Sequence, residues 1–220
     1  MRRVLDLGCG TGNLPVKANV EVDEVVGVDI DERRLALARQ RFPQRSFHCA
    51  RGESLPFANA SFDRVVSAVA LPYMDIPRTL AEVRRVLAPG GSVFFSVHPV
   101  RFTLGELWKC APNPLAMAYR CYVLLNGLVF HASGRNLRWA GRTESFQTEH
   151  GLRVALERAG FGEVVFSRPV GRLLVEARTA AADGRGRVPA AIGFPVSSRA
   201  RSWRKASGGE NSKRNLPPAS

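Results

Sequence analysis

Three glycines at alternating positions, Gly8, Gly10 and Gly12, follow a β-rich run that carries Asp6 near its end. Glycine has no Cβ and adopts backbone conformations closed to other residues, so such a loop brings main chain close to a ligand. We expect the loop to open a helix. A strand, a glycine loop and a helix in this order are typical of an open α/β sheet, where ligands bind at the carboxyl ends of the strands.

The rest of the first hundred residues repeats this alternation of short β-rich runs and helical segments, which predicts a parallel sheet with crossover helices. The expected strands are residues 3–8, 24–30, 45–50, 61–69 and 92–97. The expected helices are residues 31–42 and 78–91, the second stopped by a Pro-Gly-Gly sequence. Later in the chain, residues 148–161 predict a helix with Thr148 as N-cap and Gly160 just past its end, and residues 163–178 predict a hairpin of two closing strands.

Composition divides the chain into four parts. Residues 1–98 form the expected core, and residues 148–179 complete it. Between them, residues 99–147 are rich in Trp, Phe, Tyr, Leu and Met, which predicts an inserted, mainly helical lid or substrate region. The alternative for this lid region is an extra helical layer without a ligand role. Residues 180–220 are rich in Ala, Gly, Pro, Ser and Arg and are expected to be a disordered tail.

The formal net charge of +13 is concentrated near the C-terminus, because residues 178–220 hold nine basic and two acidic side chains. Polyanion attraction follows from such charge alone, so a nucleic-acid methyltransferase or binding protein is one alternative. No apolar run reaches the roughly 20 residues that span a bilayer, the best candidate being residues 121–130. With no recognisable signal peptide, we expect a cytoplasmic protein. Its cysteines lack CxxC or paired-His spacing, which argues against a disulfide framework or a metal site: Cys9, Cys49, Cys110 and Cys121.

The residues around the loop favour one class of ligand. Asp29, at the end of the second expected strand, lies where a carboxylate accepts both hydroxyls of a ribose. A dinucleotide fingerprint needs its third glycine one place later, where this chain has Asn13. Asp6 repels a phosphate but attracts an amino group. The pattern therefore favours a nucleoside that carries an ammonium group, and it disfavours the alternative of a dinucleotide-dependent oxidoreductase.

Four motifs in order, "VLDLGCGTGN", "GVDID", "ESLPFANASFDRVVS" and "LAEVRRVLAPGG", together resemble class I S-adenosylmethionine-dependent methyltransferases. Within that class the chain is similar to the methyltransferase type 11 group, which includes quinone-biosynthesis C-methyltransferases. The resemblance covers roughly residues 3–97. It implies an enzyme with S-adenosyl-L-methionine as cofactor. It also implies an α/β fold with a Rossmann-like, doubly wound, seven-stranded sheet, mostly parallel, whose closing hairpin supplies an antiparallel strand.

The resemblance also implies roles for the glycine loop. Asp6 and the backbone of Gly8, Cys9 and Gly10 would hold the methionine end of the cofactor, and Gly12 would complete the cofactor-binding loop.

Two further strand ends would complete the binding site. Asp29 would take the ribose hydroxyls and Ile30 would pack on the adenine face, while Ser67 would face the sulfonium.

The loop after the third strand would border the adenine edge through Glu53, Ser54 and Leu55. Here the chain departs from the family, which often has Asp where this sequence has Arg51. Arginine has no acceptor for an adenine amino group, so that contact would fall to Glu53 or to backbone, or be lost.

Two side chains are candidates for the chemistry. His98, at the end of the fifth expected strand, is a candidate general base, or it merely shapes the turn before Pro99. Tyr73 is a candidate substrate contact, or a structural aromatic. Five aromatic residues of the lid region favour a small, partly apolar acceptor, aromatic or lipid-like, methylated by in-line transfer: Trp108, Tyr119, Tyr122, Phe130 and Trp139.

The start of the chain suggests a last alternative. Members of the resembled family usually carry a helical segment before the first strand, where it covers the cofactor, whereas only two residues precede Arg3. A cofactor-binding fold with impaired activity is therefore retained as an alternative.

Overall fold

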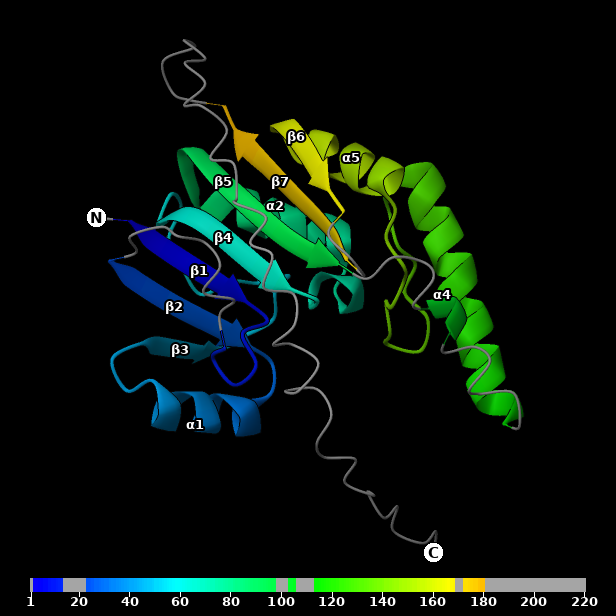
Figure 1. Ribbon diagram of the computed structural model, residues 1–220, viewed down its shortest axis with the longest axis horizontal. Helices are drawn as coiled ribbons and strands as arrows, with labels where there is room; N and C mark the ends of the chain where they lie inside the picture. Colours follow the sequence, from blue (N-terminus) through cyan, green and yellow to red (C-terminus); the bar gives the residue numbers. More distant parts are fainter. Residues whose placement is uncertain (1, 14–22, 98–102, 106–112, 169–171, 181–220) are drawn as a thin grey trace, which may run out of the picture. The chain divides into compact units, whose positions relative to one another are not determined.

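A seven-stranded sheet organises the protein, in the strand order β3-β2-β1-β4-β5-β7-β6 (Figure 1). The computed structural model describes residues 2–13, 23–97, 103–105, 113–168 and 172–180. The strands are β1 Arg3–Leu7, β2 Glu24–Asp29, β3 Ser46–Cys49, β4 Phe62–Ala68, β5 Leu87–Val97, β6 Phe161–Ser167 and β7 Leu173–Thr179. Strands β1 to β5 pair in parallel, and β7 runs antiparallel to both β5 and β6. The predicted fold class, with its antiparallel strand in the closing hairpin, is confirmed.

The four α-helices bounded in the described residues each begin at a side chain that caps the helix, whereas the short 3-10 turn does not. They are α1 Glu32–Arg41, the 3-10 turn η1 Leu71–Tyr73, α2 Ile76–Val86, α4 Pro114–Ser133 and α5 Glu149–Arg158. Asp31 accepts hydrogen bonds from the first turn of α1. Thr148 does the same for α5, as predicted, by accepting from Gly151 N at 3.1 Å. Gly160 follows the last residues of α5 with φ +81°, the left-handed conformation expected just past a helix end.

The segment after β4 corrects the sequence prediction. A helix was expected over residues 78–91, but α2 begins earlier, after the cap Asp75, and ends at Val86. Strand β5 begins at the next residue, because the buried side chain of Leu87 pairs with Phe62 at the start of β4. The Pro-Gly-Gly sequence therefore lies inside a strand with an irregular register rather than at the end of a helix.

The main core lies between the sheet and the helices α2 and α5. Helix α2 contributes Ile76, Leu80 and Val83, all 0% exposed, along one face. Helix α1 packs beside β3 and β2, where Leu35 and Phe47 form a smaller cluster. The core thus fixes the strands whose carboxyl ends carry the candidate site.

Of the lid region, the structure describes residues 103–105 and 113–147. Helix α4 is followed by residues 134–147, which contain no helix and are called the return segment below. The end of α4 packs against α5 (Figure 1). Helix α4 has 20 residues and a mean hydropathy of 1.2, so by length and composition alone it passes as a membrane span. Residues 121–130, the apolar run considered from the sequence, are only part of this helix, and length and composition alone do not distinguish a membrane span from a helix of a soluble protein. Most of the basic tail, residues 181–220, lies outside the described residues.

Candidate functional site

The carboxyl ends of β1, β2 and β4 bring three of the predicted residues to one edge of the sheet. Asp6 pairs with Gly27 of β2 on one side and with Val66 of β4 on the other. Asp29 ends β2, and Ser67 follows Val66 near the end of β4. This edge is where chain order reverses between β1 and β4, the position at which open α/β sheets bind ligands.

The three loop glycines are needed for different reasons. All have left-handed backbones, with φ of +74°, +54° and +80° for Gly8, Gly10 and Gly12. A Cβ on Gly8 would lie 2.2 Å from the Cβ of Ala70, and one on Gly12 would lie 2.9 Å from the ring of Phe42. Among the described residues, a Cβ on Gly10 would meet nothing within 4 Å. Gly10 therefore borders open space, whereas its two neighbours let the loop pack tightly.

The N–H groups of the loop are used inside the protein. Gly8 N and Cys9 N donate to Val28 O at 2.7 and 3.0 Å. Gly10 N donates to Asp29 Oδ2 at 2.8 Å, and Asp29 Oδ1 accepts from Asp31 N at 2.9 Å. What Gly8, Cys9 and Gly10 offer to a ligand is therefore carbonyl oxygen, which accepts from an ammonium group and repels a phosphate.

Asp6 is the most perturbed acid of the site. Its side chain is 4% exposed, and burial raises the pKa of its carboxyl to about 7, with the nearby charge of Asp29 adding to the rise and Arg45 opposing it. Among the described residues, no donor makes a hydrogen bond to this carboxylate. A buried acid with a raised pKa in a ligand-binding position is typical of functional sites.

Cys9 contributes backbone rather than thiol. Its side chain is 8% exposed and packs with Leu35 and Phe47. Burial raises the pKa of the thiol to about 12, so it stays neutral at physiological pH.

Ile30 and Ser67 have opposite environments. The side chain of Ile30 is 67% exposed although it directly follows the buried Asp29. An exposed branched aliphatic side chain at this position offers a flat ring system an apolar surface. The Ser67 hydroxyl is buried and has no hydrogen-bond partner in the described part of the chain.

The loop after β3 is held by its own contacts. Glu53 Oε1 accepts from Asp75 N at 2.9 Å, and Glu53 Oε2 lies 3.4 Å from Arg51 Nε. The family departure at position 51 thus places an exposed guanidinium beside Glu53. Ser54 N donates to Arg51 O at 3.1 Å, and the side chain of Leu55 lies in the core, 5% exposed.

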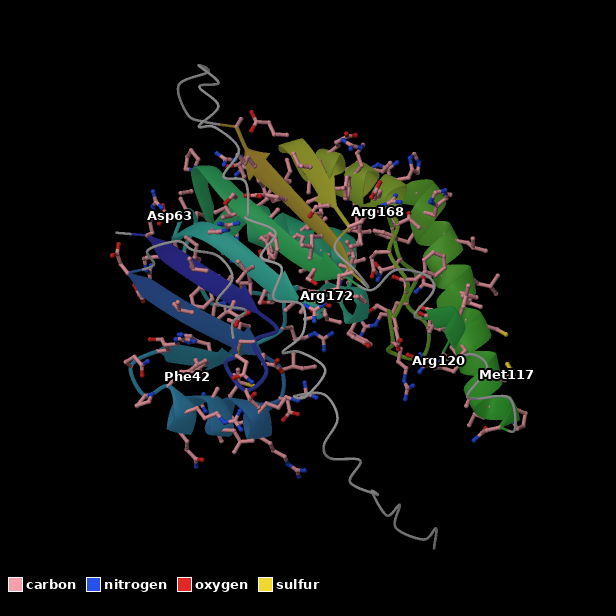
Figure 2. All side chains as sticks on the ribbon, in the orientation of Figure 1. Phe42, Asp63, Met117, Arg120, Arg168 and Arg172 are labelled. Atoms are coloured by element: carbon pink, nitrogen blue, oxygen red, sulfur yellow. The ribbon has the colours of Figure 1, made fainter. Side chains whose placement is uncertain are left out.

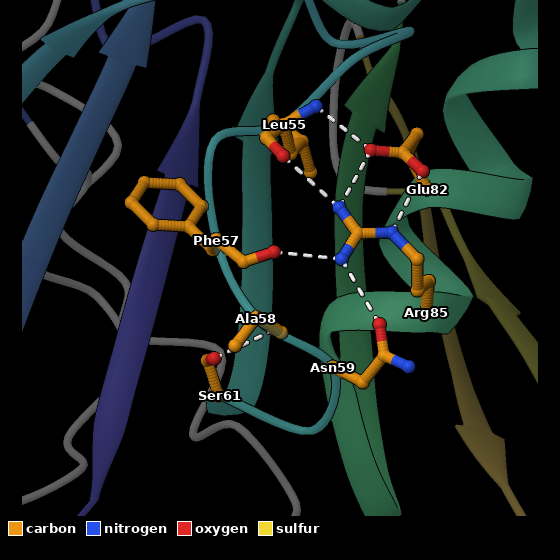
Figure 3. A network of polar contacts seen from close by, with 7 residues as sticks. All are labelled: Leu55, Phe57, Ala58, Asn59, Ser61, Glu82 and Arg85. Atoms are coloured by element: carbon orange, nitrogen blue, oxygen red, sulfur yellow. Dashed lines mark hydrogen bonds and ion pairs between the residues drawn. The ribbon is translucent and has the colours of Figure 1, made fainter.

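Arg85 ties this loop to α2, a network that sequence reasoning missed (Figure 3). Its guanidinium donates to the carbonyls of Leu55 and Phe57 at 3.0 and 2.6 Å, and it pairs with Glu82 at 2.8 Å. Glu82 in turn accepts from Leu55 N at 2.8 Å. The only signal in the sequence was the i,i+3 spacing of the two charges, which does not reveal a partner loop some 30 residues earlier.

The lid region is attached to the rim of the same edge. Tyr73 is 56% exposed, and its carbonyl accepts from Thr143 Oγ1 at 2.9 Å. Asn136 donates to Met74 O at 2.7 Å and accepts from Ile76 N at 3.0 Å. His98, the candidate base, lies outside the described residues.

The lid aromatics do not form one cluster. Phe130 is fully buried in the main core, and the hydroxyl of Tyr119 donates to Glu144 at 2.5 Å. Tyr122 and Trp139 line an open hollow of about 370 Å³ that no residue of the glycine loop borders. Trp108 lies outside the described residues. In the part of the chain that the structure describes, no three His, Cys, Asp or Glu side chains are grouped to hold a metal ion.

Comparisons with known proteins agree with this geometry. A family model described as "Methyltransferase domain" matches residues 5–95. The demethylmenaquinone methyltransferase of Thermus thermophilus is 30% identical over 172 residues, which cover 73% of this chain and 74% of that protein. The biotin biosynthesis bifunctional protein BioHC of Cellvibrio japonicus is 31% identical over 173 residues, which cover 78% of this chain. This chain spans only 30% of the length of that second relative.

Solved structures share the fold. A S-adenosylmethionine dependent methyltransferase from Mesorhizobium loti superposes with a TM-score of 0.55 and 23% identity, over 80% of this chain and 90% of that one. At 23% identity, this structural similarity supports the fold and nothing further.

Proposed function

This chain belongs to the class I S-adenosylmethionine-dependent methyltransferases, and on that premise we propose that it transfers a methyl group in line to a small, partly apolar acceptor. Family and fold imply S-adenosyl-L-methionine as the cofactor. The observation that carries the proposal is the pair of buried acids at the carboxyl edge, beside a loop whose middle glycine borders open space.

The residues at this edge fit that cofactor. Asp6 supplies a carboxylate for the ammonium group of the methionine end, next to loop carbonyls that also accept. Asp29 keeps acceptor capacity for ribose hydroxyls, since each of its oxygens takes one backbone N–H and has a second lone pair. Ile30 offers its exposed side chain to the adenine face, and the unpartnered hydroxyl of Ser67 lies toward the reacting end.

When bound, the cofactor supplies a methyl group that its sulfonium has already activated. The protein then has to orient the acceptor and exclude water, and such positioning is worth on the order of 7–11 kcal/mol of the barrier. Tyr73, exposed at the rim and held through its backbone to the lid region, is our candidate for orienting the acceptor. His98 remains our candidate for removing a proton from it.

The proposal that the acceptor is partly apolar rests on the exposed side chain of Tyr73. Tyr73 is the exposed aromatic residue that directly follows β4 and the loop packed on Gly8. An exposed aromatic side chain at a ligand-binding edge favours acceptors with an apolar or aromatic part.

The test is transfer of a labelled methyl group. Full-length protein is incubated with methyl-labelled S-adenosyl-L-methionine and separate quinol, phenol and lipid acceptors. We expect labelled product from at least one apolar class, and at least a tenfold lower rate for Tyr73→Ala. Asp63→Asn, at the opposite end of β4 (Figure 2), is the matched control and should leave the rate unchanged. Tight cofactor binding without transfer to any class would refute the proposed activity while leaving the cofactor site intact.

A further inference from the structure

Helix α4 has two faces of different character. Its inner face is buried and consists of Val123, Asn126, Gly127 and Phe130. Its outer face carries two large exposed apolar side chains, Leu125 at 63% and Leu128 at 58% exposed. Only 22% of the most apolar stretch of the helix is buried. Within the described residues, the outer face therefore lacks the cover that a helix of this hydropathy normally has in a folded protein.

The turn that follows α4 is tied to the inner face of the helix and places Trp139 at the border with the outer face. Leu137 N donates to Asn126 Oδ1 at 2.6 Å, and the Tyr122 hydroxyl lies 2.9 Å from Leu137 O. These contacts hold Trp139 against Tyr122, with ring centroids 5.4 Å apart. Trp139 is 57% exposed and borders the open hollow together with Leu125. Tyr122, Leu125 and Trp139 thus line one apolar hollow, and Leu128 follows Leu125 about one turn along the helix.

The charged side chains around this surface are mostly positive. Residues 113–148 contain four arginines and a single acid, Glu144. Glu144 is only 18% exposed and is paired with Arg120 on the side of α4 that faces the return segment (Figure 2). Arg135 and Arg138 are exposed in the turn that carries Trp139. An apolar surface bordered by arginine and by an aromatic residue is the pattern of helices that lie in the headgroup region of anionic membranes.

We propose that the outer face of α4, together with Trp139, docks this protein on the surface of an anionic lipid bilayer. The helix lies on the bilayer rather than across it, because Asn126 and Phe130 fix its inner face to the return segment and the core. A second copy related by two-fold symmetry would bring arginines against arginines, whereas anionic lipid offers the opposite charge. The proposal goes beyond methyl transfer and is tested without cofactor.

The first experiment is sedimentation of the full chain with vesicles. One set is phosphatidylcholine, and the other is an equal mixture of phosphatidylcholine and phosphatidylglycerol. We expect binding to the anionic set, reduced about tenfold by Leu125→Glu, since one buried leucine is worth more than a factor of ten. Arg138→Gln should reduce it about fivefold. Leu37→Glu is the matched control, because Leu37 is 46% exposed on α1.

Every variant keeps residues 181–220, so binding through the basic tail alone is common to all of them. Equal binding of Leu125→Glu and Leu37→Glu would overturn the proposal. Concentration-dependent dimerisation that Leu125→Glu abolishes, without vesicle binding, would overturn it in favour of a second copy.

A second measurement does not depend on the folding of the glutamate variant. In a chain that carries Trp108→Phe and Trp203→Phe, lipids brominated near the headgroup should quench the fluorescence of Trp139 when the chain is bound, and adding Trp139→Phe should remove that quenching. Binding of the chain in which Trp139 is the single tryptophan, without quenching of its fluorescence, would overturn the assignment of this face.

Discussion

Replacing Asp6 by asparagine is expected to stabilise the ligand-free protein at alkaline pH. The carboxyl is buried and its pKa rises from 3.8 to about 7. Because the folded chain then binds the proton more tightly than the unfolded chain, stability falls as pH rises through this range and the full penalty is present above about pH 7. Each tenfold change in proton affinity is worth about 1.4 kcal/mol, so the penalty approaches about 4 kcal/mol.

The assay is denaturant unfolding of wild type and Asp6→Asn near pH 4.5 and near pH 8, without ligand. Most of the penalty is absent at the acid pH, so the difference between the two proteins should change by about 3 kcal/mol in favour of the variant as pH rises. That corresponds to about 6–12 °C in melting temperature for a chain of this size. Asp63→Asn, which removes a carboxyl at the opposite end of β4, is the control.

A difference that is the same at both pH values would refute the reasoning that burial controls this carboxyl. With S-adenosylhomocysteine present the sign should reverse, because the ionised carboxylate is the form that attracts an ammonium group. Asp6→Asn should then gain less stability from ligand than wild type does.

Three further predictions concern neighbouring groups. Asp29→Asn should weaken S-adenosylhomocysteine binding at least tenfold in calorimetry, and an unchanged affinity, equal to that of Asp63→Asn, would remove Asp29 from the ribose site. Arg85→Lys should lower the free energy of unfolding by about 2 kcal/mol, because lysine cannot reach both loop carbonyls and Glu82 at once; an unchanged unfolding midpoint would contradict the importance of that network. Gly8→Ala should lose the folded state, because its Cβ meets another at 2.2 Å, whereas Gly10→Ala should cost only about 1–2 kcal/mol and abolish ligand binding. Equal stability of the two alanine variants would show that the loop packs differently.

Local chemistry made parts of the fold predictable from sequence. The spacing of the loop glycines predicted a ligand site at the carboxyl ends of the strands. Thr148, as the expected N-cap, predicted where α5 begins. Both signals act within a few residues, where steric and hydrogen-bonding preferences decide the outcome. The start of β5 was missed, because Leu87 follows a helical pattern in sequence while its burial against Phe62 of β4 sets its conformation.

The candidate site divides in the same way. Asp6 and Asp29 follow from strand ends and are placed as expected at one edge of the sheet. The loop after β3 is different, because the side chain of Leu55 is buried in the core and its carbonyl accepts a hydrogen bond from Arg85. The aromatic residues of the lid region could not be assigned from composition, because each one's environment depends on how α4 and the return segment pack.

The central claim is that this edge binds an amino-acid nucleoside with an ammonium group rather than a dinucleotide. Calorimetric titration of the full-length protein with S-adenosylhomocysteine and with NADH tests it most directly. We predict saturable binding of one S-adenosylhomocysteine per chain, tighter near pH 8 than near pH 6, and no binding of NADH. Binding of NADH, or a folded protein that does not bind S-adenosylhomocysteine at either pH, would contradict the claim.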